Sequence, residues 1–143
     1  MSFFDSILRF SYSRDLHQHL KGLSVDCAGY TANSVYQVVS LVMLVISLLI
    51  MLNYYYGLFN HPRHTRRWVW LINVLVACGI TGTIAYFMGA AGLPEEQHCK
   101  DIHFTRMDCM LFASTAMLYT FLVCFIFSLL FKWKSVANKK VPF

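Results

Sequence analysis

Cysteine and histidine side chains close to one another in the sequence are the first candidates for chemistry. Cys99 and His103 lie one helical turn apart with His98 beside Cys99, and Cys27 and Cys109 fall on the same predicted side of a membrane. Thiolate and imidazole are good ligands for zinc or copper, but this spacing matches no strong metal motif and the cysteines lack the CxxC form. The sequence therefore predicts no metal and no cofactor.

The same cysteines leave a redox alternative open. Unpaired cysteines are the leading interpretation. A disulfide between Cys27 and Cys99, or between Cys99 and Cys109, is the alternative if that side of the membrane faces an oxidising compartment.

A dense basic segment is the second candidate site. It contains His61, Arg63, His64, Arg66 and Arg67. Basic residues beside a membrane attract anionic lipid headgroups by ~1 kcal/mol each. Without a recognisable nucleic-acid-binding module, this cluster is a weak signal for DNA or RNA, so we expect headgroup binding and no nucleic-acid partner.

Motifs typical of enzymes and pumps are missing from the sequence. There is no glycine-rich phosphate loop, nucleophile elbow or HExxH motif. Ion-coupled carriers place an ionisable side chain deep in a membrane span, whereas here only Asp108 lies at the edge of one. These features argue against catalysis, and we predict that the protein is not an enzyme.

The composition predicts a membrane protein. The chain has 143 residues, of which 57% are hydrophobic and 13% are charged, against ~25% charged residues in soluble domains. Residues 68–94 contain no charged side chain, and as a helix they are long enough to cross a hydrocarbon core of ~30 Å. Small residues recur along this span at spacings of four, three, four and three, which places them on one stripe that favours close helix packing; they are Cys78, Gly82, Ala85, Gly89 and Gly92.

Two further spans are predicted at residues 34–56 and 109–131. The later one has its own small-residue face, made of Ala113, Ala116, Thr120, Cys124 and Ser128. The earlier one has a polar face, made of Asn33, Gln37, Ser40 and Ser47. Such faces either pack inside one bundle, or line a subunit interface or a pore.

An amphipathic helix is predicted at residues 3–20, where apolar side chains recur every four residues and Gly22 is a plausible stop. We expect it at the membrane interface or on a partner. The chain thus divides into an interfacial helix with a connector (1–33), a three-helix transmembrane bundle (34–134) and a basic tail (135–143).

Aromatic residues and charge predict the orientation. All three tryptophans and Tyr54 to Tyr56 fall at one interface if the chain crosses three times. That side holds seven of the 12 Lys and Arg residues and none of the seven Asp and Glu residues. The positive-inside rule then places the N-terminus outside and the C-terminus in the cytoplasm, and we expect a plasma membrane of the bacterial inner-membrane type.

The sequence therefore predicts an all-α integral membrane protein with an N-terminal amphipathic helix and three transmembrane helices. Our leading hypothesis is a non-catalytic subunit that serves as scaffold or anchor of a homo- or hetero-oligomeric membrane complex, such as a secretion or transport assembly. Its partners would be the lipid bilayer, anionic headgroups, and itself or other membrane subunits. A homo-oligomeric pore is the alternative, and a membrane-embedded lipid-modifying enzyme is the third hypothesis.

Overall fold

The fold is all-α, as predicted. The computed structural model describes residues 14–22, 29, 34–56, 67–91 and 105–133. Within these ranges it has a short N-terminal helix and three long helices, which are α2 (Arg14–Leu20), α3 (Val35–Tyr56), α4 (Arg67–Ala90) and α5 (Arg106–Phe131).

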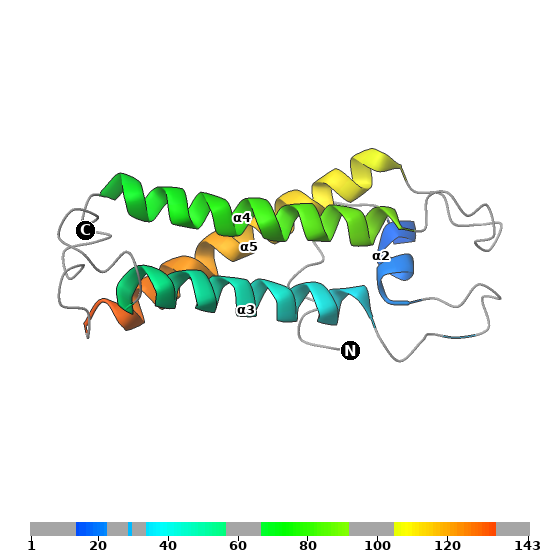
Figure 1. Cartoon of the computed structure of the whole chain (residues 1–143). Coiled ribbons are helices and arrows are strands. Elements are labelled where there is room, and N and C mark those ends of the chain that lie inside the picture. Colours follow the sequence, from blue (N-terminus) through cyan, green and yellow to red (C-terminus); the bar gives the residue numbers. More distant parts are fainter. Residues whose placement is uncertain (1–13, 23–28, 30–33, 57–66, 92–104, 134–143) are drawn as a thin grey trace.

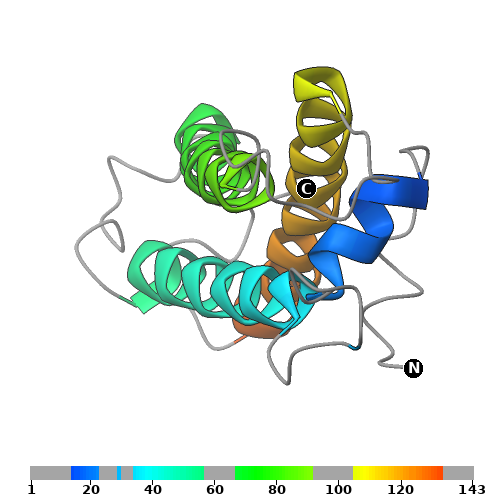
Figure 2. The same cartoon turned by 90° about the vertical axis from the view of Figure 1, so that its right-hand side faces the viewer.

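The three long helices form one bundle. Helices α3 and α4 run side by side in opposite directions, and α5 crosses them obliquely, near α4 at its own start and near α3 at its own end (Figure 1). Figure 2 shows the same arrangement from the end of the bundle where α2 lies. Every pair of long helices is therefore in contact, and the contact between α4 and α5 is the most extensive.

Each long helix can cross a bilayer. The helices have 22, 24 and 26 residues, or ~33–39 Å at 1.5 Å per residue, against a hydrocarbon core of ~30 Å. Large apolar side chains such as Leu41, Ile72 and Leu130 point away from the bundle and are mostly exposed. These spans indicate an integral membrane protein whose outer surface contacts lipid.

Capping explains why α5 begins at Arg106, three residues earlier than predicted. The Asp108 carboxylate accepts hydrogen bonds from the Thr105 backbone N–H at 2.9 Å and from the Thr105 hydroxyl at 3.0 Å. An acidic side chain in the first turn also complements the positive end of the helix dipole. At the other boundary, α4 ends at Ala90, earlier than the predicted end near Pro94, which lies outside the described residues.

Helix α2 packs on the bundle of its own chain. Of the predicted 3–20 helix, the structure describes the part from Arg14 to Leu20. Its Leu16 and Leu20 are fully buried in a cluster with Tyr36 of α3 and Phe112 of α5. The sequence showed no element for this helix to pack on, and the structure provides the end of the bundle; the location of the helix at the membrane interface stays a prediction. Gly22 follows the helix with a φ of 82°, a left-handed conformation suited to glycine at a helix end.

Two clusters of buried side chains make up the core. One lies where α2 meets the three long helices. The other lies toward the opposite end of the bundle and includes Met51, Tyr54, Tyr55, Trp70 and Cys124. Between them, the small residues of α4 and α5 let the two helices approach closely.

Candidate functional site

Helices α4 and α5 are in close contact at Gly82. The side chain of Met117 lies directly over this glycine: a Cβ atom added there would be 2.7 Å from Met117 Cγ and 3.1 Å from Met117 Sδ. One turn earlier, the Cys78 thiol donates a hydrogen bond to the Met117 backbone carbonyl over 3.5 Å. Only a residue without a side chain fits position 82 without displacing Met117.

Further along α4 the contact is looser. A Cβ at Gly89 would lie 3.5 Å from Phe112 Cδ1 and 3.9 Å from Cys109 Sγ, which are ordinary van der Waals distances. Of the stripe predicted on this span, Gly92 lies outside the described residues and the other members are buried, namely Cys78, Gly82, Ala85 and Gly89. The small-residue face predicted on the third span is buried as well, at Ala113, Ala116, Thr120, Cys124 and Ser128.

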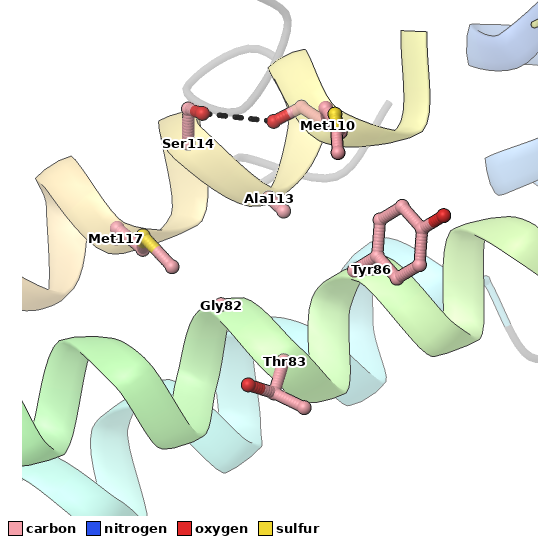
Figure 3. A pocket seen from close by; sticks show the side chains of 7 residues that line it. All are labelled: Gly82, Thr83, Tyr86, Met110, Ala113, Ser114 and Met117. Atoms are coloured by element: carbon pink, nitrogen blue, oxygen red, sulfur yellow. Dashed lines mark hydrogen bonds between the residues drawn. The ribbon is translucent and has the colours of Figure 1, made fainter. Parts of the chain in front are cut away.

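A groove opens beside this contact, on the outer surface between α4 and α5. Its volume is about 360 Å³. Figure 3 shows the side chains that line it, which are Gly82, Thr83, Tyr86, Met110, Ala113, Ser114 and Met117.

The two small hydroxyls of the groove are already bonded within their own helices. Thr83 donates to the Gly79 carbonyl over 2.7 Å, and Ser114 donates to the Met110 carbonyl over 2.8 Å. Only Tyr86 brings a further polar atom, and its hydroxyl points toward the end of the bundle where α4 ends and α5 begins (Figure 3). The walls of the groove are therefore apolar in character, with one polar atom toward one end.

A polar network joins the long helices at the opposite end. The Trp70 indole N–H donates to the Ser128 hydroxyl over 2.8 Å, and that hydroxyl donates to Met51 Sδ over 3.3 Å. Nearby, the Tyr56 hydroxyl donates to the Phe131 carbonyl over 3.1 Å. These bonds connect α3, α4 and α5 where polar groups have few other partners in lipid.

The polar face predicted on the first span is divided between two environments. Ser40 and Ser47 are buried inside the bundle of one chain, and the Ser40 hydroxyl donates to the Tyr36 carbonyl over 2.6 Å. Gln37 is exposed, and Asn33 lies outside the described residues. The two serines are therefore buried between the helices of one chain in this structure.

Most of the other predicted site residues fall outside the described ranges. Of the basic segment, Arg67 is the exposed first residue of α4, whereas His61, Arg63, His64 and Arg66 are not described. Cys27 and Cys99 are also not described, so a bond between them stays a prediction. Cys109 is a buried, free thiol in this structure, and because Cys99 is not described, the Cys99–Cys109 alternative also stays a prediction. Within the described part of the chain, no group of three His, Cys, Asp or Glu side chains is placed to hold a metal ion.

Sequence reasoning missed the residues that shape the groove. Met117, Tyr86 and Ser114 belong to none of the predicted faces, because their role depends on which neighbouring helix lies opposite. It also missed Thr81, whose fully buried hydroxyl has no hydrogen-bond partner in the described structure. A threonine in an apolar span gave no signal that could separate it from ordinary packing.

No family model, curated protein or solved structure matches this chain.

Proposed function

We propose that this chain is a non-catalytic membrane subunit that acts as scaffold or anchor of a larger membrane assembly. The observation that carries the proposal is the inward use of polar side chains. Trp70, Ser128 and Ser40 all form hydrogen bonds inside the bundle, and a bundle held together in this way presents a largely apolar surface to lipid and to other membrane proteins.

The outer face of α4 is the surface best suited to a partner helix. Gly79 is exposed, and a Cβ built on it would meet no atom within 4 Å. Exposed glycines in membrane helices let a second backbone approach closely. Gly82, the more obvious glycine in the sequence, is covered by Met117 and is not available for this role.

Gly79 and Gly82 give a matched pair of variants that tests the proposal. Gly79→Leu adds bulk where there is space, so it should preserve the fold and weaken assembly. Gly82→Leu adds bulk against Met117, so it should disturb the bundle itself. Native mass spectrometry from mild detergent should report a complex of defined stoichiometry for the natural chain and a smaller particle for Gly79→Leu. A single-copy particle for the natural chain, with no companion protein, would contradict the proposal.

The burial of Ser40 and Ser47 weighs against the pore as a competing function. In a homo-oligomeric channel lined by this face, both hydroxyls would face water. Planar-bilayer recordings provide the test, and we expect no conductance that responds to Ser47→Leu.

We further propose that the C-terminus is cytoplasmic and that the membrane is a bacterial inner membrane. Support comes from Trp68 and Trp133, which are 73% and 80% exposed and lie at the end of the bundle where α4 begins and α5 ends. They share that end with Arg67 and Lys132, the combination expected at a cytoplasmic interface. The cysteine of an Asn138→Cys variant should not react with an impermeant thiol reagent added to intact cells. Labelling from outside would contradict a cytoplasmic C-terminus.

A further inference from the structure

With the end of α4 taken as the membrane surface, the groove lies at the depth of the acyl chains of one leaflet. Tyr86 is four residues before Ala90, the last residue of α4, and Gly82 is eight residues before it. At 1.5 Å per residue these positions are ~6 Å and ~12 Å from the helix end, inside a half-bilayer of ~15 Å. The groove volume of about 360 Å³ falls in the usual range for small-molecule sites.

The polarity of the groove suits an amphiphilic ligand. The hydroxyls of Thr83 and Ser114 donate to carbonyls of their own helices, so a ligand gains no new hydrogen bond from them. The Tyr86 hydroxyl points toward the end of the bundle (Figure 3), which is the direction of the headgroups. A ligand that matches this pattern is apolar along most of its length and has a hydrogen-bond acceptor near the interface.

The glycine of the groove is not open to a second helix. Glycine gives a partner helix its closest approach, but Met117 Cγ lies 2.7 Å from the place of a Cβ on Gly82. The exposed small residues of the groove are Thr83 and Ser114, so a protein helix is the competing occupant that the test must separate from lipid. A flexible chain can follow the methionine side chains, whose unbranched stems adapt to irregular contacts.

We propose that this groove binds one acyl chain of a membrane glycerophospholipid, with the Tyr86 hydroxyl donating a hydrogen bond to an ester carbonyl of the lipid. The tail lies along Met110 and Met117, and the headgroup lies beyond Tyr86 at the interface. The groove adjoins the outer face of α4 around Gly79, because Thr83 lies one turn after Gly79 and donates to its carbonyl, but a lipid site here does not require the scaffold function.

Photolabelling tests the site directly. The full chain is reconstituted in nanodiscs with a phosphatidylcholine that carries a diazirine in the middle of one acyl chain, and the adducts are mapped by peptide mass spectrometry. Adducts should be about fivefold more frequent at Met110 and Met117 than at Leu122 and Ile126, which are exposed residues of α5 outside the groove.

Groove-filling variants provide the specificity control. Ser114→Phe should remove the excess labelling at Met117, whereas Leu118→Phe, on an exposed neighbouring position, should leave it. Thr83→Phe fills the groove from the opposite wall, and it replaces Ser114→Phe in this test if Ser114→Phe lowers the melting temperature. Equal labelling of all exposed faces, or an unchanged excess in both filling variants, would overturn the proposal. So would efficient cross-linking of a Met110→Cys variant to a second copy, because a protein would then occupy the groove.

Discussion

The indole N–H of Trp70 on α4 donates a hydrogen bond to the hydroxyl of Ser128 on α5 over 2.8 Å, and both side chains are buried. Ser128 in turn donates to Met51 of α3. One small hydroxyl thus joins three spans, and the burial of both side chains keeps competing water away from the bond. Away from such bonds, the long helices are held together by close packing. The effects of breaking a hydrogen bond and of disturbing the packing can be predicted separately.

A double-mutant cycle on Trp70→Phe and Ser128→Ala measures the hydrogen bond. Such bonds between membrane helices average ~0.6 kcal/mol and reach ~1.7 kcal/mol in the strongest pairs. We expect a coupling free energy in this range from unfolding in mixed micelles. Strict additivity of the two single variants would show that the bond contributes nothing to stability.

The contact between Gly82 and Met117 predicts a large difference between two neighbouring glycines. Gly82→Leu forces Met117 and α5 away from α4 and should lower the free energy of unfolding by ~1–3 kcal/mol, the usual cost of overpacking. Gly79→Leu points into open space and should stay within ~0.5 kcal/mol of the natural chain. Thermal unfolding of both variants in one detergent provides the measurement. Equal losses in the two variants would contradict the packing described here.

Truncating Met117 provides a second test of the same contact. If Met117 is what excludes a side chain at position 82, Met117→Ala should recover part of the stability lost in Gly82→Leu, a coupling of ~0.5–3 kcal/mol. A Met117→Ala change that adds to the loss without compensation would mean that backbone contacts, rather than this side chain, set the limit.

The buried hydroxyl of Thr81 predicts a stabilising substitution. A buried polar group without a hydrogen bond costs ~1–3 kcal/mol, so Thr81→Val, which removes the hydroxyl and keeps the shape, should raise the free energy of unfolding by ~1 kcal/mol. Thr120→Val is the matched control, because the Thr120 hydroxyl donates to the Ala116 carbonyl over 2.7 Å, and it should not stabilise. A clear loss of stability in Thr81→Val would reveal a partner for this hydroxyl.

A contact between His17 and Tyr36 joins α2 to the bundle beside the buried Leu16 and Leu20. The Tyr36 hydroxyl lies 2.7 Å from His17 Nδ1, and the Tyr36 ring packs edge-on against Phe112 with centroids 5.9 Å apart. Tyr36→Phe keeps the ring and removes the hydrogen bond, so amide exchange in α2 should accelerate by up to about tenfold, the equivalent of ~1.4 kcal/mol. Tyr56→Phe, at the other end of the bundle, should leave exchange in α2 unchanged.

The sequence was sufficient to predict the spans, since an uncharged apolar segment of this length has few other stable states. It did not reveal the start of α5, because the cap formed by Thr105 and Asp108 lies before the apolar run. Nor did it reveal the groove. A helical wheel shows which residues share a face, but the cover that Met117 provides over Gly82 depends on the rotation and register of a second helix.

The direction of the polar face was undecidable from the sequence for the same reason. Ser40 and Ser47 share a face on any helix, whether that face points into a bundle or into a pore. Similarly, the apolar side of α2 was visible in the positions of Leu16 and Leu20, but the surface that buries it is assembled from α3 and α5. In each case the missing information was the identity of the neighbour across a helix contact.

Spin-label accessibility along α4 is the most direct test of the claim that lipid surrounds this bundle and that α4 packs on α5 through its small residues. Single labels at exposed Ile72, Leu75, Val76 and Thr83 should collide readily with oxygen and rarely with a water-soluble nickel chelate, and a label at Gly79, where a partner helix is proposed, should also meet nickel rarely. Labels at buried Val74, Ala77 and Ala85 should be shielded from both reagents. Strong collision with nickel at Gly79 or Thr83, or high oxygen access at Ala85, would contradict the structure.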